Sequence, residues 1–295
     1  MPLEGVHLLL TYRCDRECDH CFVWGSPSAE GTMGLELIRE ILDGAHRMGT
    51  VRTVFFEGGE PFLFYSLMAE GMRLAAERGF ETGIVTNGYW AIGPEEAGAA
   101  LRPLLGLRLA DLSVSSDLFH GEEEETPEWR HSRTAAERLG IPAGSISIGQ
   151  PCAAEMADEG SLRYRGRAAE KLVAGQPLQP WESFRECPHE DLADPGRVHV
   201  DAFGDVHLCQ GLLLGSVRER PLDALFAAYD PKTHPIVGPL LAGGPAELVR
   251  RYPWPHEEGY IEACHLCYCT RAHLRTRFPS FLGPGQVYGE KPAGD

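Results

Sequence analysis

The stretch GVHLLLTYRCDRECDHC, residues 5–21, joins a run of apolar residues to a group of cysteines. The short apolar run over residues 5–12 predicts a buried strand that leads directly into a polar loop. Within that loop, Cys14, Cys18 and Cys21 have the spacing C-x3-C-x2-C. Three thiolates this close together predict one compact metal centre.

Two kinds of metal centre fit this triad. A structural zinc ion usually needs a fourth ligand, and His20 and Asp15 lie inside the loop as candidates for it. A cubane iron–sulfur cluster can instead be held by three cysteines, which leaves one iron open. The triad alone therefore leaves zinc binding, an iron–sulfur cluster and a reactive-thiol pair as alternatives.

Helical and strand-like segments alternate after this loop. Helices are expected over residues 35–48, 61–79, 94–105 and 127–139. Strands are expected over residues 53–57, 82–86, 109–115 and 145–150. Strands separated by helices imply parallel βαβ units with right-handed crossovers. Five or six such units predict an α/β fold, a partial (β/α)6-type barrel.

Glycines and polar residues follow each of the next strands. They are Gly58, Gly59, Glu60 and Pro61 after the second strand, Asn87 after the third, and Ser113, Ser115 and Asp117 at the end of the fourth. Barrel enzymes place their chemistry at the carboxyl ends of the strands. Each motif taken alone is a turn signal, but their occurrence in order favours a functional site. The two glycines permit a tight turn and close backbone approach to a ligand.

The cysteine spacing and the sequence GGEP at residues 58–61 resemble the two signature motifs of the radical S-adenosylmethionine (SAM) superfamily. The resemblance covers about residues 5–150. It implies a 4Fe–4S cluster held by Cys14, Cys18 and Cys21, with SAM chelating the unique iron. The reduced cluster would cleave SAM to a 5′-deoxyadenosyl radical, which abstracts hydrogen from a C–H bond.

The same resemblance implies roles for the other motif residues. The backbone of the GGEP motif and the side chain of Glu60 would meet the methionine ammonium group. Ser115 and Asp117 match positions that contact the ribose or the methionyl carboxylate. The backbone at His20 would meet the adenine, and Asn87 would support the SAM site or face the substrate.

A second set of cysteines lies near a hairpin expected over residues 197–210. A four-thiolate zinc site is the physical rival here. The spacing C-x16-G-x4-C from Cys187 to Cys209 resembles the start of the twitch and SPASM extensions of radical SAM enzymes, which hold auxiliary 4Fe–4S clusters. The ligands that the resemblance implies are Cys187, Cys209, Cys264 and Cys267, with Cys269 as an alternative to Cys267. Cys152 is interpreted as a small buried residue.

The resemblance divides the chain into a partial barrel over residues 1–175 and a twitch-like domain over residues 176–295. Acidic residues outnumber Lys and Arg by 43 to 27, and the net charge of −16 disfavours nucleic-acid partners. The sequence contains no apolar run long enough for a membrane helix and no signal peptide, so we expect a cytoplasmic protein with reduced thiols.

The function implied is that of a radical SAM oxidoreductase or modifying enzyme, with an auxiliary cluster for electron transfer or substrate binding. Its partners would be a small-molecule or peptide substrate and an external electron donor such as flavodoxin or ferredoxin. The first strand is expected to begin at about Gly5, which leaves no room for a leader-binding domain and favours a small substrate or a peptide delivered by a separate partner. The alternatives are a RiPP-type peptide-modifying enzyme with a separate partner and, in another class, a zinc-stabilised binding protein.

Two further patterns stay open. Arg163, Arg165 and Arg167 can bind a substrate carboxylate or phosphate, or they can simply begin a solvated helix. The twelve histidines show neither H-x3-H nor HExxH spacing, so no metal role is assigned to them.

Overall fold

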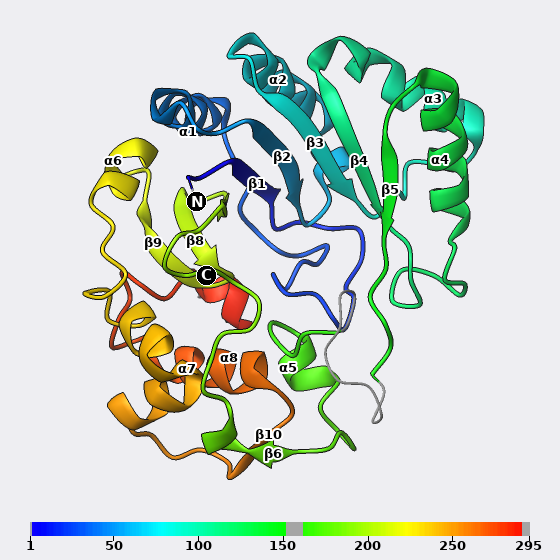
Figure 1. Ribbon diagram of the computed structural model, residues 1–295. Helices are drawn as coiled ribbons and strands as arrows, with labels where there is room; N and C mark the ends of the chain where they lie inside the picture. The colour runs from blue at the N-terminus through cyan, green and yellow to red at the C-terminus, as the bar shows by residue number, and fades with distance from the viewer. Residues whose placement is uncertain (1, 152–161, 291–295) are drawn as a thin grey trace.

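The computed structural model describes residues 2–151 and 162–290. Its centre is an eight-stranded sheet with the strand order β5-β4-β3-β2-β1-β7-β8-β9 (Figure 1). The first six strands in this order are parallel, whereas β8 and β9 are antiparallel to their neighbours. The strands are β1 Gly5–Thr11, β2 Thr53–Gly58, β3 Glu81–Thr86, β4 Leu109–Ser115, β5 Ala143–Ile146, β7 Arg197–Val200, β8 Asp205–Cys209 and β9 Leu212–Ser216.

Four helices follow the first four strands and cover the outer face of the sheet (Figure 1). They are α1 Leu35–Met48, α2 Tyr65–Glu77, α3 Pro94–Leu101 and α4 Pro127–Leu139. The 3-10 turns Pro61–Phe64 and Arg102–Leu107 precede α2 and follow α3, so the expected helices 61–79 and 94–105 are each part 3-10 helix. The apolar residues of α1 face the core, as their helical spacing predicts.

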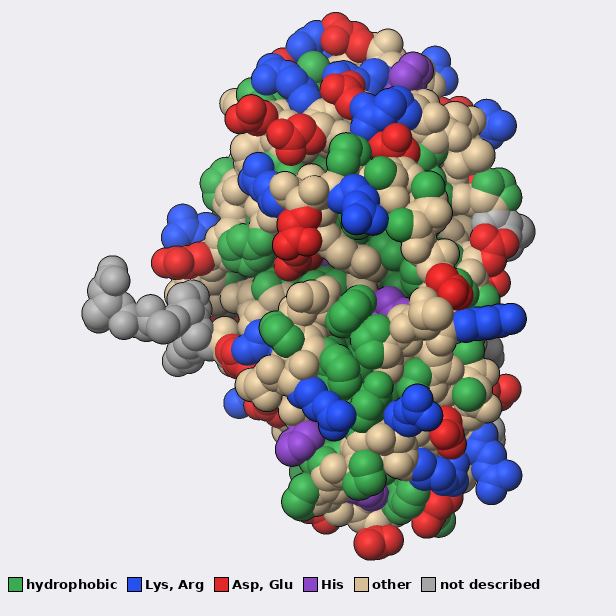
Figure 2. All heavy atoms as spheres, turned by 90° about the vertical axis from the view of Figure 1, so that its left-hand side faces the viewer, with side chains coloured by type: hydrophobic (Ala, Val, Ile, Leu, Met, Phe, Trp, Pro, Cys, Tyr) green, Lys and Arg blue, Asp and Glu red, His purple; other side chains and the backbone are tan. Residues whose placement is uncertain are grey.

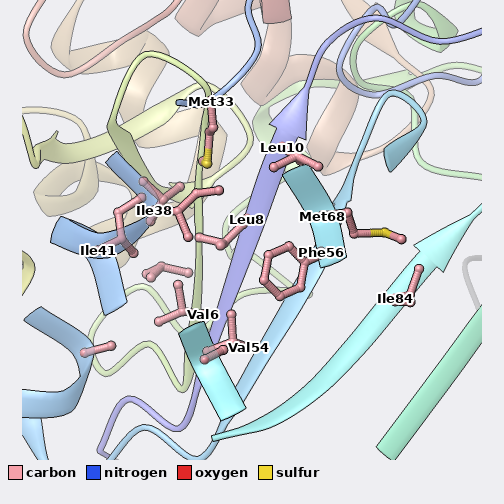
Figure 3. Close-up of a cluster of buried hydrophobic side chains, with 14 of the residues drawn as sticks. Val6, Leu8, Leu10, Met33, Ile38, Ile41, Val54, Phe56, Met68 and Ile84 are labelled. Carbon is pink, nitrogen blue, oxygen red and sulfur yellow. The ribbon is translucent and has the colours of Figure 1, made fainter. Parts of the chain in front are cut away.

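The main core lies between the sheet and these helices (Figure 3). Val6, Leu8 and Leu10 of β1 point into it together with Val54 and Phe56 of β2. Successive residues of a strand face opposite sides, so the residues between them lie on the inner face of the sheet. Burying each large apolar side chain contributes about 1.5–3 kcal/mol.

The expected partial α/β barrel is confirmed, and the described residues form no closed barrel. Four βα units are complete, whereas β5 ends at Ile146 and is followed by coil over residues 147–151. The sixth parallel strand is β7, which pairs with β1 on the side opposite to β2. One sheet thus crosses the boundary expected at residue 176, and the division into two domains stays a prediction.

The later elements extend this sheet and add a helical layer below it (Figure 1). The expected hairpin is present as β7 and β8, with its turn at residues 201–204. The remaining elements are α5 Ala168–Lys171, β6 Gln179–Pro180, the 3-10 turn Trp181–Ser183, α6 Leu222–Ala227, α7 Val237–Arg251, β10 Gly259–Tyr260, α8 Ala263–Leu274 and the 3-10 turn Gly285–Tyr288. The paired Gly243 and Gly244 form a kink inside α7. Cys152 lies outside the described residues.

No helix of the described residues is both long and apolar enough to span a bilayer. Acidic and basic side chains are interspersed with hydrophobic ones on the face that Figure 2 shows.

Candidate active site and metal centres

A cavity of about 450 Å³ lies on the inner face of the sheet, within the size range of small-molecule sites. Alternate residues of the strands line it, because they point away from the helices. These residues include His7, Phe55, Glu57, Val85, Ser113, Ser115 and His199. Cys14, Cys18 and Cys21 line the same cavity. The cysteine loop and the strand ends are therefore brought together, as the motif order predicts.

The thiols of the loop accept hydrogen bonds from the chain itself. The sulfur of Cys14 accepts the backbone amide of Arg16 at 3.4 Å and the side-chain amide of Asn87 at 3.6 Å. The backbone amide of Gly25 donates to the sulfur of Cys21 at 3.2 Å. Burial raises the pKa of Cys14 to about 12, so a bound cation is needed to hold it as a thiolate. These donors fit a thiolate-ligated metal centre.

The glycine-rich turn is pressed against the start of the cysteine loop. The backbone amide of Gly59 donates to the carbonyl of Thr11 at 2.6 Å. A Cβ atom on Gly58, where φ is 129°, would lie 2.4 Å from the carbonyl oxygen of Thr11, and one on Gly59 would lie 2.1 Å from that of Arg13. Only glycine allows the two segments to approach this closely. Both glycines line the cavity.

Glu60 and Pro61 lie behind this turn. Glu60 is fully buried and is not part of the cavity lining. Its carboxylate accepts the backbone amides of Phe62 at 2.9 Å and Asn87 at 2.8 Å, and the hydroxyl of Thr86 at 2.8 Å. Pro61 begins the 3-10 turn and is also buried. The side chain of Glu60 does not line the cavity. The predicted contact with the methionine ammonium group therefore concerns the backbone of the motif alone, and it stays a prediction.

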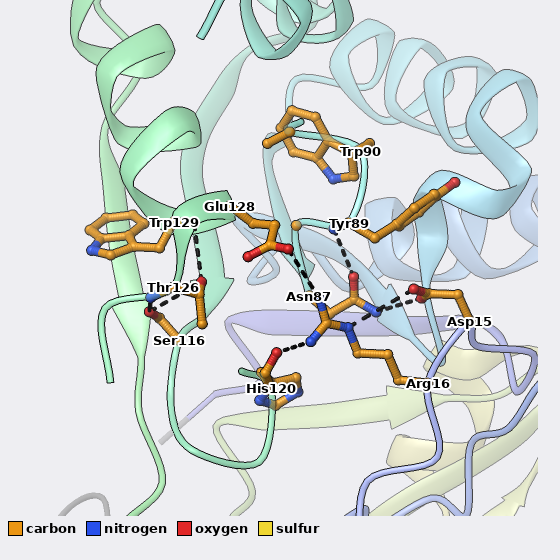
Figure 4. Close-up of polar contacts among 12 residues, drawn as sticks. Asp15, Arg16, Asn87, Tyr89, Trp90, Ser116, His120, Thr126, Glu128 and Trp129 are labelled. Carbon is orange, nitrogen blue, oxygen red and sulfur yellow. Dashed lines mark hydrogen bonds and ion pairs between the residues drawn. The ribbon is translucent and has the colours of Figure 1, made fainter. Parts of the chain in front are cut away.

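Asn87 connects the end of β3 to the cysteine loop (Figure 4). Its side-chain amide donates to the carboxylate of Asp15 at 2.7 Å, and its side-chain oxygen accepts the backbone amide of Tyr89 at 2.9 Å. Arg16 reaches across to the backbone carbonyl of His120 and lies 3.7 Å from the carboxylate of Glu128. Asn87 thus supports the loop that carries the cysteines.

Asp117 is buried at the end of β4. Its Oδ1 atom accepts the ring Nδ1 of His120 at 2.8 Å and the backbone amide of Phe119 at 2.9 Å, while Oδ2 accepts the amide of Ile148 at 3.1 Å. The side chain therefore fixes the loop after β4, and it borders the cavity together with Ser115. Their contacts with SAM stay predictions.

His20 stacks on Phe119, with 4.4 Å between the ring centres. Burial lowers the pKa of His20 to about 4, so the imidazole is neutral. The sequence patterns did not single out Phe119, which supplies the aromatic partner beside the predicted adenine position.

The three arginines of residues 163–167 have different environments. Arg167 is 3% exposed and donates to the carbonyls of Cys18 at 2.6 Å and Gly25 at 2.8 Å. These hydrogen bonds hold the cysteine loop in place. Neither of the two sequence interpretations anticipated this role for Arg167. Arg163 and Arg165 line the cavity.

The second set of cysteines converges between α8 and the hairpin. Cys264 and Cys267 are three residues apart in α8 and so lie on one face of the helix. The pKa of Cys267 is raised to about 11, mainly by burial and in part by the nearby Cys209 and Cys187. Cys269 packs instead against a cluster that includes Phe184, Tyr260 and Leu266. The structure therefore groups the four cysteines Cys187, Cys209, Cys264 and Cys267.

Buried cations and amides surround this second group. Arg165 donates to the sulfur of Cys209 at 3.4 Å, and the side chain of Arg271 is within hydrogen-bond reach of Cys267. Arg271 also donates to the backbone carbonyl of Gln210 at 2.7 Å. The Nε atom of Arg271 and the side-chain amide of Gln210 are buried without partners among the described residues. Unsatisfied donors beside four thiols fit a cluster whose sulfides accept hydrogen bonds.

Three cavity residues were missed by the sequence analysis. His7, Glu57 and His199 lie on β1, β2 and β7 and meet on the inner face. Burial alone would raise the pKa of Glu57, but the two histidines lower it below its usual value. The available signal was a single polar residue inside each apolar strand. Such a residue indicates a cavity-lining position only once the inner face of the strand is known.

Comparison with known proteins supports the motif assignment. The model of the radical SAM superfamily matches residues 8–116. YydG of Bacillus subtilis (strain 168), a protein assigned to peptide biosynthesis, is 29% identical over 117 residues, which are 40% of this chain and 37% of YydG. A cofactor-modifying protein of the tungsten-containing aldehyde ferredoxin oxidoreductase of Pyrococcus furiosus is 36% identical over 87 residues, which are 29% of this chain and 24% of that protein. The matched segments thus span less than half of either relative.

Two solved structures share the fold at low sequence identity. BtrN in an open conformation superposes with a TM-score of 0.51 at 12% identity, covering 89% of this chain and 97% of BtrN. The enzyme anSMEcpe with bound AdoMet superposes with a TM-score of 0.50 at 14% identity, covering 98% and 99%. The family match includes all three cysteines of the loop and the glycine-rich turn, so this part of the chain is similar to the radical SAM superfamily.

Proposed function

We propose that the chain is a radical SAM enzyme with two 4Fe–4S clusters. Cys14, Cys18 and Cys21 hold the first cluster, to which SAM binds. The ligands of the second cluster are Cys187, Cys209, Cys264 and Cys267. The observation that carries the proposal is that all three cysteines of the loop line one cavity together with the glycine-rich turn and the strand ends.

Bound there, the first cluster and SAM supply a 5′-deoxyadenosyl radical that removes a hydrogen atom from the substrate, and the second cluster supplies an acceptor for the remaining electron. The chain positions these groups. The backbone of Gly58 and Gly59 would face the methionine ammonium group, and Ser115 would face the ribose. Arg167 and Asn87 hold the cysteine loop in place.

The cavity favours a substrate with an anionic group. Arg163, Arg165 and Arg197 line it, and guanidinium groups bind carboxylates and phosphates through paired hydrogen bonds. The similarity to YydG, a protein assigned to peptide biosynthesis, supports a peptide substrate, and a small carboxylate-bearing molecule is the other substrate class. In this proposal the enzyme works in the cytoplasm, where an external donor such as flavodoxin or ferredoxin reduces it.

Arg165 connects the two proposed cluster sites. Its guanidinium lies over the ring of Phe22, which follows Cys21 directly, at 5.4 Å from the ring centre. The same side chain donates to the sulfur of Cys209 at 3.4 Å. This contact supports an electron-transfer role for the second cluster, since both sites border one side chain.

Anaerobic reconstitution with iron and sulfide tests the proposal. The chain should hold about eight irons, four in each cluster, and should form 5′-deoxyadenosine from SAM when dithionite is added. Cys18→Ala should lose one cluster and all SAM cleavage, whereas Cys209→Ala should lose the other cluster and retain cleavage. A colourless chain with two zinc ions and no nucleoside product would instead support a zinc-stabilised binding protein. Loss of both clusters from a folded Cys209→Ala chain would contradict the two-site assignment.

A further inference from the structure

A compact group of nitrogen and oxygen ligands lies on the inner face of the sheet, apart from both sets of cysteines. His7 and His199 are directly paired across the parallel strands β1 and β7, and Glu57 comes from β2 on the other side of β1. The carboxylate of Glu57 lies 3.3 Å from Nδ1 of His7 and 3.0 Å from Nε2 of His199. The three ligand atoms all lie within 4.8 Å of one another.

Hydrogen bonding within this group leaves one ligand atom unsatisfied. Glu57 is 8% exposed, and its Oε1 atom is buried without a well-aligned donor among the described residues, although Nε2 of His199 is near. A buried carboxylate oxygen without a donor is costly unless a cation compensates it. The unpaired oxygen is a second observation that points to a ligand, and it does not depend on the spacing of the three side chains.

We propose that His7, Glu57 and His199 form a binding site for a divalent cation of the zinc class. Two imidazoles and one carboxylate are the ligand set of zinc sites that keep an open position. The single carboxylate also offsets part of the charge of the ion. The nitrogen and oxygen ligands separate this site from the thiolate groups, which suit iron–sulfur clusters.

The strands hold the three ligands rigidly. Each ligand comes from a paired position in the sheet, and the ring of His7 stacks on Phe55 with 4.6 Å between centres and an angle of 8°. Arg197, two residues before His199, is half exposed and lies 3.7 Å from the carboxylate of Glu190. Ligands on a rigid scaffold need little reorganisation on binding.

All three ligands line the cavity that also contains the loop cysteines. The open position of the ion therefore faces the substrate, and an oxygen of a substrate carboxylate or carbonyl group would complete its coordination. The metal site does not depend on the proposed radical chemistry. A substrate oxygen bound to the ion would hold the substrate in position for that chemistry.

Calorimetric titration of zinc chloride into the anaerobic, cluster-loaded chain tests the site. The wild type should bind about one zinc ion. Glu57→Gln and His199→Ala should each weaken binding by about 100-fold or more, since each removes one of three protein ligands. His46→Ala, at an exposed histidine in the last turn of α1, is the matched control and should bind zinc like the wild type. The iron content of every sample shows whether both clusters are in place.

Diffraction data collected above and below the zinc absorption edge locate the ion separately from iron. A zinc peak between the three side chains would support the site. No binding to the loaded wild type, binding only after iron is lost, or equal affinity in a folded His199→Ala chain would overturn it. If Glu57→Gln fails to fold, His199→Ala carries the comparison. Zinc binding here without formation of 5′-deoxyadenosine would overturn the proposed function and leave this site intact.

Discussion

The backbone amide of Asn87 donates a hydrogen bond of 2.8 Å to the Oε2 atom of Glu60, which ties the turn after β3 to the turn after β2. Asn87 then reaches the sulfur of Cys14 with its side-chain amide. A carboxylate outside the cavity thus helps to set the position of the cysteine loop. Its protonation state therefore affects the stability of the site.

We expect Glu60→Gln to change how stability depends on pH. Burial raises the pKa of Glu60 to about 7 from the ordinary value of 4.5. Because the folded chain binds this proton more tightly than the unfolded chain, the contribution is present below the unfolded pKa and is lost as the pH rises toward about 7. The amide that replaces the carboxyl group cannot titrate, so this decline should be absent in the variant. Thermal unfolding midpoints across this range measure the difference.

The same variant should also be less stable than the wild type at low pH, where both side chains are neutral. The Asn87 amide loses its carboxylate acceptor, and an unsatisfied buried donor costs about 1–3 kcal/mol. Glu36→Gln, at an exposed position in the first turn of α1, is the control and should leave the pH profile unchanged. An identical decline in Glu60→Gln and wild type would show that other groups cause it.

A second prediction concerns Gly83, which lies under the ring of Phe55. A Cβ atom at this position would lie 2.4 Å from a carbon of that ring. Gly83→Ala should therefore displace Phe55 and the His7 ring stacked on it, at a cost of about 1–3 kcal/mol. Gly106→Ala is the control, because a Cβ atom at Gly106 meets no neighbouring atom within 4 Å. Chemical denaturation of both variants measures the cost, and equal stability would contradict the predicted displacement.

A third prediction separates two neighbouring cysteines of α8. Cys267 shares a helix face with Cys264 and is close to Cys209, whereas Cys269 packs into another apolar cluster. Cys267→Ala should therefore lose about four irons, and Cys269→Ala should keep them. Iron analysis of the reconstituted variants provides the measurement. Retention of all iron in Cys267→Ala, or a matching loss in Cys269→Ala, would reverse the assignment.

The sequence predicts the first half of the fold well because its signals are local. The strand 109–115 and the helix 127–139 begin and end where the patterns place them. The cysteine loop and the glycine-rich turn also carry their own spacing signals, and the structure brings both to one cavity.

The features that the sequence did not predict depend on contacts between distant segments of the chain. Nothing in the local sequence of β7 indicates that it pairs with β1, and this pairing alone brings His199 beside His7. The role of Arg167 likewise depends on carbonyls about 150 positions earlier in the chain, at Cys18 and Gly25. The sequence analysis considered only an exposed or substrate-facing arginine there, because single-residue patterns do not reveal which side chain becomes buried.

The last prediction concerns the buried cation beside the second group of cysteines. Arg271 is 2% exposed and contacts Cys267, so its charge acts through a poorly screening medium. A reduced cluster is more negative than an oxidised one, and a nearby cation therefore stabilises the reduced form. Arg271→Leu should lower the midpoint potential of the second cluster, by an amount on the order of 100 mV.

A redox titration monitored by electron paramagnetic resonance measures this potential in a Cys18→Ala background, which lacks the first cluster. Arg275→Leu is the matched control, because Arg275 lies one turn further along and pairs with the carboxylate of Glu290. Arg271→Lys keeps the charge and should retain most of the potential, which separates electrostatic tuning from lost packing. An unchanged potential in Arg271→Leu with full iron content would show that the thiolates and not this cation determine the potential.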